Sequence, residues 1–301
     1  MVHAGISLEE ILRAHENWLA NAATGRCADL SGVTLNDRDL HGVKLTGAQL
    51  AGATLLDANL AGADLGAARL NQADLQRANL AGADLTAADL TETNFGGAWL
   101  TSANVSEAVV RGTSFRRAKL EHARFLDAAL TEANFQDAMA RSMQFHQARL
   151  YEVDWHGADI AGAQFFHARI QHSRFANVQG GGASFRGSKL DHCDFSRASL
   201  EDAGFGRAEV TQCTFRGATL EHADFRGAHV RGGDFSRATL NGARFGGAQL
   251  AGADFRGANL QGARELTGKQ LLKTLTDHAT VLPNGARGPY LRHSGAERPS
   301  R

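Results

Sequence analysis

The chain has 301 residues, of which 43% are apolar and 21% are charged, and its 32 basic and 32 acidic side chains cancel to a formal net charge of zero. This composition excludes general disorder, because the apolar residues suffice for a substantial core. Its short apolar runs exclude a membrane-spanning helix, which needs about 20 consecutive apolar residues, and three cysteines argue against a disulfide framework.

The N-terminal segment is predicted to form a capping helix. Ser7 and Glu10 have the spacing of a capping box, in which each side chain bonds the other residue's backbone N–H. Ile6 and Ile11 stand at the positions of a hydrophobic staple, so we expect a helix over 8–19. The segment lacks the basic start and hydrophobic block of a secretory leader, and we therefore expect a cytoplasmic protein.

From residue 28 to residue 264 the sequence repeats every five residues. Leu, Phe, Val, Ile or Trp occupies nearly every position numbered as a multiple of five, except at Ala140 and Gly180, and the residue two places earlier is mostly alanine. A period of five fits neither a helix nor a strand, and one such unit cannot bury two inward side chains alone. The pattern predicts a solenoid whose stacked coils share a core. Representative inward residues are Leu60, Leu65, Leu70, Leu75, Phe205, Phe215, Phe225 and Phe235.

Runs such as ANLAG-ADLGA and ADLTA-ADLTE resemble the pentapeptide repeat proteins. The resemblance implies an all-β fold, a right-handed quadrilateral β-helix with four pentads in each coil. It also implies that the alanine and the Leu or Phe of each pentad point inward. Residues 20 apart would then stack at the spacing of paired strands, about 4.7–4.9 Å.

Aromatic residues follow a period of ten in the second half of the repeat, from Phe115 to Phe255. Ten residues are half a coil, so aromatic side chains are predicted to line two opposite walls and aliphatic side chains the other two. The first half has Leu on all four walls up to Phe95, and we expect the two halves to differ in girth or twist.

The C-terminal end is predicted to close the solenoid with a second short helix. Thr267 and Gln270 repeat the capping box and predict a helix over 268–278, and the segment beyond Pro283 is predicted to be a mobile, mildly basic tail. The predicted organisation is an N-terminal capping helix (1–25), the β-helix (26–264), a C-terminal capping helix (265–283) and a flexible tail (284–301).

The histidines offer one candidate metal site. On a 20-residue coil His172 and His192 would be neighbours on the surface, with Glu152 and Gln212 on either side. Two imidazoles and a carboxylate suit a divalent ion. Because Glu152 and His192 would lie two coils apart, we interpret the column as ordinary solvated side chains and predict no metal site.

The sequence also offers little for catalysis. Cys193 and Cys213 fall at inward small positions and are predicted to be buried thiols. A convex tube of regular coils provides neither a nucleophile beside a base nor a water-excluding pocket. We therefore expect no catalytic residue, no cofactor and no enzymatic activity.

Charge is unevenly distributed along the repeat. Residues 26–110 hold five Lys or Arg against ten Asp or Glu, whereas residues 111–264 hold 20 against 16. The basic candidates for a binding surface, predicted to form one ridge along four consecutive coils, are Arg197, Arg216, Arg237 and Arg256. The acidic candidates are Asp64, Asp74, Asp84 and Asp89, although Asp before an inward Leu is common enough here to be structural.

Three functions are compatible with this sequence. The first is a rigid scaffold that docks a protein partner through its charged faces. The second is implied by the resemblance, since some pentapeptide repeat proteins are DNA mimics that bind DNA gyrase or topoisomerase IV and confer resistance to topoisomerase poisons. The third, direct nucleic-acid binding, is weakened by the neutral overall charge and the lack of exposed aromatic residues among the basic ones. No membrane association is expected, and a homodimer through a terminal helix is left open.

Overall fold

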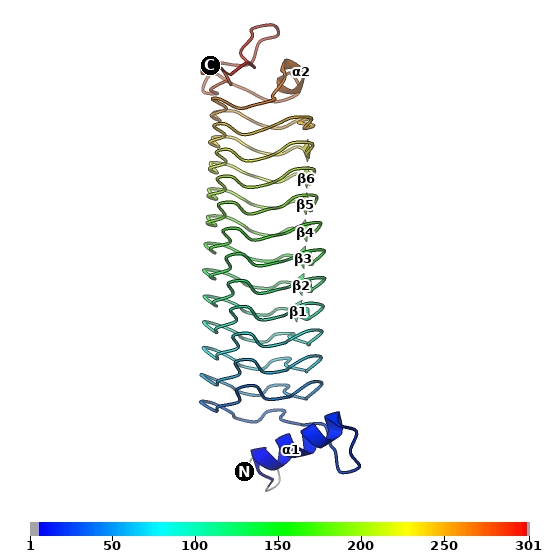
Figure 1. Ribbon diagram of the computed structural model, residues 1–301. Coiled ribbons are helices and arrows are strands. Elements are labelled where there is room, and N and C mark those ends of the chain that lie inside the picture. The colour runs from blue at the N-terminus through cyan, green and yellow to red at the C-terminus, as the bar shows by residue number, and fades with distance from the viewer. Residues whose placement is uncertain (1–5, 300–301) are drawn as a thin grey trace. The chain divides into compact units, whose positions relative to one another are not determined.

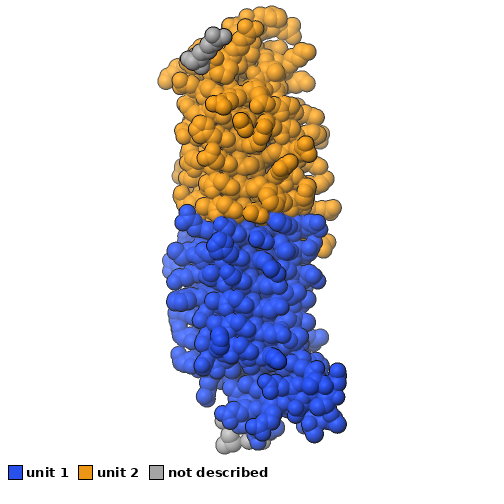
Figure 2. Space-filling view, viewed as in Figure 1, with its two compact units in different colours: residues 1–148 blue, residues 149–301 orange. Residues whose placement is uncertain are grey.

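The computed structural model describes residues 6–299, so the outermost residues of both predicted terminal segments lie outside the described residues. Figure 1 shows the elements in chain order. The chain divides into two compact units, Met1–Ala148 (unit 1) and Arg149–Arg301 (unit 2), coloured separately in Figure 2. Each unit is built of right-handed quadrilateral coils, which confirms the predicted fold class. The division falls inside the segment that we predicted as one β-helical domain, and the pentad pattern gives no signal of it.

Each pentad builds one wall in the same way, as residues 63–67 illustrate. Ala63 and Leu65 are buried, whereas Asp64 lies on the outer surface and pairs with the next coil. The chain then turns, and the Ala68 amide after the turn donates to the Leu65 carbonyl at 3.0 Å. The second turn residue, here Ala67, has a φ of +52°, a left-handed conformation that explains why glycine is frequent at this position.

Residues 20 apart in sequence pair in parallel from coil to coil. In unit 1 the Leu65 amide donates to the Asp84 carbonyl at 2.7 Å, and the Asp84 amide donates back to Ala63 at 2.9 Å. In unit 2 Asp194 pairs with Thr214 in the same register. The predicted 20-residue coil is therefore confirmed within each unit.

One wall of the coils is extended enough to form short strands, each with a buried central residue. In unit 1 β1 (Val109–Arg111) pairs in parallel with β2 (Ala129–Thr131). The strands of unit 2, paired in parallel in chain order, are β3 (Arg149–Tyr151), β4 (Arg169–Gln171), β5 (Lys189–Asp191), β6 (Glu209–Thr211) and β7 (His229–Arg231).

Aromatic rings fill the core of unit 2 in two interleaved stacks. Phe205 stacks on Phe185 and Phe225 at centroid distances of 5.1 and 4.9 Å. It also meets Phe195 and Phe215 edge-on at 6.1 and 5.5 Å. Stacked rings 20 residues apart and edge-on rings ten residues apart show that the aromatic walls face each other across the core. The eight representative inward residues are each at most 1% exposed.

The two exceptions to the repeat are accommodated without opening the core. Ala140 in unit 1 is fully buried. In unit 2 a Cβ on Gly180 would lie 2.8 Å from Leu200 Cδ2 and 3.3 Å from Ile160 Cγ1. The side chains from the adjacent coils therefore occupy the space that a larger residue at position 180 would need.

The N-terminal helix α1 (Leu8–Leu19) has the predicted bounds and capping box. The Ser7 amide donates to Glu10 Oε2 at 2.8 Å, and the Glu10 amide donates to Ser7 Oγ at 3.2 Å. His15 is fully buried, and its Nδ1 accepts a hydrogen bond from the Ala28 amide at 3.0 Å. This bond ties the helix to the first coil of unit 1.

The C-terminal helix α2 (Gly268–Leu271) is shorter than predicted, so the expectation of a helix to residue 278 was wrong. The chain instead returns to the ladder of the last coil. The Leu275 amide donates to the Ala253 carbonyl and the Val281 amide donates to the Ala258 carbonyl, both at 2.9 Å. Hydrogen bonds to the last coil therefore take the place of the backbone hydrogen bonds that a longer α2 would have made.

The predicted mobile tail is also corrected, because residues 284–299 fold back on the end of unit 2. Arg287 forms an antiparallel bridge with Val281, and the Tyr290 amide donates to Thr276 Oγ1 at 2.9 Å. The Tyr290 hydroxyl donates to Glu297 at 3.0 Å. Among residues 6–299, neither helix has the length and apolar character that crossing a lipid bilayer requires.

Candidate functional site

The four acidic candidates do not form one acidic surface. Asp64 and Asp84 pair in adjacent coils, but Asp74 lies half a coil away from them and Asp89 lies on a third wall. Each carboxylate accepts a hydrogen bond from the backbone amide two residues later, at 2.9–3.2 Å. These bonds support the structural interpretation of Asp before an inward Leu.

The four arginine candidates lie at one corner of unit 2. The Arg197 amide donates to the Arg216 carbonyl and the Arg237 amide to the Arg256 carbonyl, so these pairs come from adjacent coils. Arg256 makes an ion pair with Asp254 at 2.6 Å, and its guanidinium holds the pKa of that carboxyl below the usual value. Within the described part of unit 2 the other three arginines make no ion pair. The basic ridge therefore carries less free charge than the sequence suggests.

A basic hollow of about 490 Å³ lies on another wall of unit 2, where Gly204 and Gly206 leave the surface low. Arg186, Arg207 and Arg226 from consecutive coils line it. Arg226 makes a two-pronged ion pair with Asp224, another lining residue, which lowers the pKa of that carboxyl. In such a pair, Asp and Arg flank the aromatic residue of one pentad and neutralise each other. A count of basic residues along the sequence therefore overestimates the free positive charge of this surface.

A column of outward residues on one wall of unit 1 carries large apolar side chains. The acidic candidates, the arginine candidates and the basic hollow described above do not. We call it the Trp99 column. Its members, paired from coil to coil, are Asp39, Asn59, Asn79, Trp99, Lys119 and Met139. Trp99 and Met139 are 49% and 48% exposed, and Lys119 Nζ lies over the Trp99 ring, 4.2 Å from its centroid. The polar members form an amide ladder, with bonds of 2.8 and 3.1 Å.

This column was not predicted from the sequence, although the sequence contains the signal for it. The residue just before the inward Leu or Phe of each pentad faces outward, and a Trp or Met there cannot be buried in the core. The sequence predicted no exposed aromatic residues among the basic ones; Trp99 and Tyr151 are both exposed, but neither belongs to the predicted basic ridge. Neither lies in a basic stretch of alternating aromatic and positive side chains of the kind that binds single strands.

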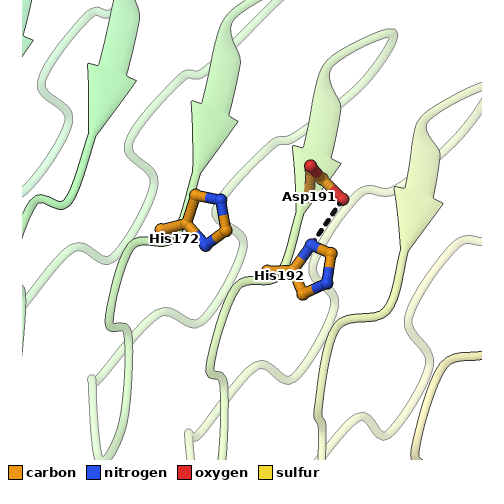
Figure 3. Close-up of side chains that lie close together, drawn as sticks. All are labelled: His172, Asp191 and His192. Atoms are coloured by element: carbon orange, nitrogen blue, oxygen red, sulfur yellow. Dashed lines mark hydrogen bonds and ion pairs between the residues drawn. The ribbon is translucent and has the colours of Figure 1, made fainter.

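Unit 2 also brings together three potential metal ligands, His172, Asp191 and His192 (Figure 3). One ligand atom from each lies within 4.8 Å of the other two. Asp191 Oδ1 lies 2.8 Å from His192 Nδ1, and the two imidazoles stack with centroids 5.1 Å apart. From the sequence, Glu152 was the candidate carboxylate of this column. In the structure the carboxylate near the two histidines is Asp191, at the end of β5.

The buried cysteines are placed as predicted. Cys193 and Cys213 are each 1% exposed, and the Cys193 amide donates to Cys213 Sγ at 3.4 Å. The hydrogen bond with Cys213 and burial raise the pKa of Cys193 well above its ordinary value. The thiol form is therefore favoured, which lowers the reactivity of this side chain.

Two family models match the chain. The model described as pentapeptide repeats (8 copies) matches residues 27–66, 68–106 and 98–137, and the model described as a pentapeptide repeat region matches residues 188–264. The chain is a pentapeptide repeat protein. The matched segments cover most of the coils of this pentapeptide repeat protein, in both units.

Solved structures similar to this pentapeptide repeat protein include HetL, a pentapeptide repeat protein involved in heterocyst differentiation regulation in the cyanobacterium Nostoc sp. strain PCC 7120. The identity is 23% over 94% of this chain and 99% of HetL, with a TM-score of 0.35. QnrB1, a plasmid-mediated fluoroquinolone resistance protein, is 17% identical over 82% of this chain and 88% of its own, with a TM-score of 0.26. No curated protein sequence matches this chain.

Proposed function

We propose that this protein is a non-catalytic scaffold that docks a protein partner through the Trp99 column. The observation that carries the proposal is the pair of half-exposed side chains Trp99 and Met139, on a column whose other members are polar or charged. Tryptophan is enriched at the centres of protein interfaces, because its ring contributes a large apolar area at a low cost in conformational entropy.

The column also indicates the chemistry of the partner. Lys119 covers the Trp99 ring and makes no ion pair within the described part of unit 1. A complementary surface therefore offers an apolar pocket for the indole and a carboxylate for the Lys119 ammonium group. The hydrogen-bonded ladder of Asp39, Asn59 and Asn79 fixes the adjacent surface, so little side-chain ordering accompanies binding there.

The charged faces that we predicted as the docking surface have a supporting role in this proposal. Exposed charges change the rate and orientation of association more than the affinity. Residues 26–110, where the acidic excess lies, include Trp99, and the basic ridge of Arg197, Arg216 and Arg237 belongs to unit 2. Charge reversal in either set is expected to change the salt dependence of binding rather than abolish it.

The proposal is tested by affinity purification of the tagged protein from native lysate at low and moderate salt. Trp99→Ala should lose the partner, whereas Val109→Ala should retain it. Val109 is the matched control, because it is 48% exposed on β1, half a coil away from Trp99. Equal recovery of the same partner by the wild type and Trp99→Ala would show that docking does not use this column.

A second candidate is a DNA mimic that binds a type II topoisomerase such as DNA gyrase. The acidic excess of residues 26–110 and the adjacent Asp64 and Asp84 favour it. The spread of the acidic candidates over three walls gives it less support than the Trp99 column gives to docking. Recovery of gyrase or topoisomerase IV subunits after nuclease treatment, followed by inhibition in a supercoiling assay, is the result expected of this candidate. The homodimer through a terminal helix stays an untested prediction.

A further inference from the structure

His172, Asp191 and His192 form a cluster that the docking proposal does not use. We infer that this cluster binds a divalent transition-metal ion such as Zn²⁺, through one nitrogen of each imidazole and one carboxylate oxygen of Asp191. The three residues lie in unit 2, and the test of the site does not depend on the Trp99 column.

The backbone holds both histidines at the same corner of successive coils. β4 and β5 pair with Gln171 opposite Asp191, so the residues that follow them, His172 and His192, leave the sheet together. The His172 amide donates to the Asp191 carbonyl at 2.9 Å, and the His192 amide donates to the Thr211 carbonyl at 3.0 Å. A site on such a hydrogen-bonded ladder is held more rigidly than one on a loose loop.

The side chains are close enough to share one ion. Their ligand atoms lie within 4.8 Å of one another, and Asp191 Oδ1 is already 2.8 Å from His192 Nδ1. Zinc bonds to nitrogen and oxygen are about 2.0–2.2 Å long, so two ligand atoms of a tetrahedral ion lie about 3.4 Å apart. The ligand atoms therefore have to approach one another by up to about 1.4 Å when an ion binds; Figure 3 shows their positions without an ion.

The donor set selects the class of metal. Two imidazoles and one carboxylate suit Zn²⁺, Cu²⁺ and Ni²⁺, whereas Ca²⁺ and Mg²⁺ prefer sites made of oxygen atoms. Three protein ligands leave a coordination position for water. His192 is 54% exposed, so solvent reaches the cluster.

One of the two cationic side chains beside Asp191 is compensated by an ion pair. Asp191 also lines a hollow of about 360 Å³, which Arg169 and Lys189 share. Lys189 makes an ion pair with Glu209 at 3.0 Å, so its positive charge is compensated.

Titration of the chelator-treated full-length protein with ZnCl₂, followed by isothermal calorimetry, tests the inference. His192→Asn removes one ligand and keeps the fold, because asparagine tolerates the φ of +51° at this position. His222→Asn is the matched control, since His222 is an exposed turn residue with a φ of +59° outside the cluster. We expect His192→Asn to weaken zinc binding at least about 10-fold and His222→Asn to leave it unchanged.

Two further measurements separate the site from adventitious binding to the other histidines. Asp191→Asn should also weaken zinc binding, and zinc should raise the melting temperature of the wild type but not of His192→Asn. A wild type that binds no zinc would overturn the inference. The same conclusion would follow if the wild type, His192→Asn and His222→Asn bound zinc with equal stoichiometry and affinity.

Discussion

Replacement of Phe205 tests the packing of unit 2 most severely. The Phe205 ring is fully buried and contacts four other rings, two stacked at 4.9 and 5.1 Å and two edge-on at 5.5 and 6.1 Å. Truncation to alanine removes these contacts and leaves a cavity, because the surrounding rings are held by the coils above and below. Phe→Ala substitutions in cores of this kind cost about 3–5 kcal/mol of the free energy of unfolding.

Phe205→Asp should be more damaging than Phe205→Ala, since it places an unpaired carboxylate among aromatic rings. For a domain of 150–250 residues, 1 kcal/mol corresponds to a change of about 2–4 °C in melting temperature, so Phe205→Ala should lower it by roughly 6–20 °C. Arg207→Ala is the control, because Arg207 is an exposed turn residue of the same coil. Circular dichroism melts of the full-length protein measure all three. A Phe205→Asp variant that melts like the wild type would show that the inward assignment of the fifth residue is wrong.

Three other predictions concern the exception to the repeat and the two ends. Gly180→Leu restores the repeat pattern yet should lower the melting temperature, because the added side chain overlaps Leu200, at a cost of about 1–3 kcal/mol. Burial lowers the pKa of His15 by disfavouring its charged form, so the stability of unit 1 should fall as the pH drops below about 6.5, where the unfolded chain binds the proton. Asp277 accepts a hydrogen bond from the Gly257 amide, which lowers the pKa of the carboxyl. Asp277→Ala should therefore destabilise unit 2 near neutral pH and reduce the further loss of stability in acid. Thermal melts across the pH range measure both effects.

Each of these predictions has a matched comparison. Leu200→Ala in the Gly180→Leu background should recover part of the lost stability, and a Gly180→Leu protein that melts higher than the wild type would contradict the packing account. His15→Gln should remove the part of the pH dependence between pH 7.5 and 5.5 that comes from this residue, and an unchanged pH profile would mean that the pKa of His15 does not differ between the folded and the unfolded chain. Equal acid sensitivity of Asp277→Ala and the wild type would exclude a role for that carboxylate.

The coils could be predicted from sequence because one short period determines them. Ala63 and Leu65 point inward for the same reason as their equivalents in every pentad, and the hydrogen bonds that pair Asp64 with Asp84 follow from the same 20-residue register. The length of α2 could not be predicted this way. Its end depends on Leu275 and Val281, whose amides bond to the last coil instead of continuing the helix, a choice made by tertiary contacts rather than by local pattern.

The candidate sites were less predictable than the coils. The outward position of Trp99 follows from the pentad alone, but its contact with Lys119 depends on the conformations of both side chains. Likewise, the register places His172 beside His192, whereas only the structure shows the Asp191 carboxylate turned toward them. Charge counts failed for a related reason, since ion pairs such as Asp254 with Arg256 form within one pentad.

The most direct test of the docking account is a binding titration between this protein and the partner recovered by affinity purification. A tryptophan at the centre of an interface typically contributes at least about 2 kcal/mol, so Trp99→Ala should raise the Kd about 30-fold or more. Val109→Ala should leave the Kd within about twofold of the wild type, as expected for a residue outside the contact. An equally small change for Trp99→Ala would contradict the claim that the Trp99 column is the docking surface.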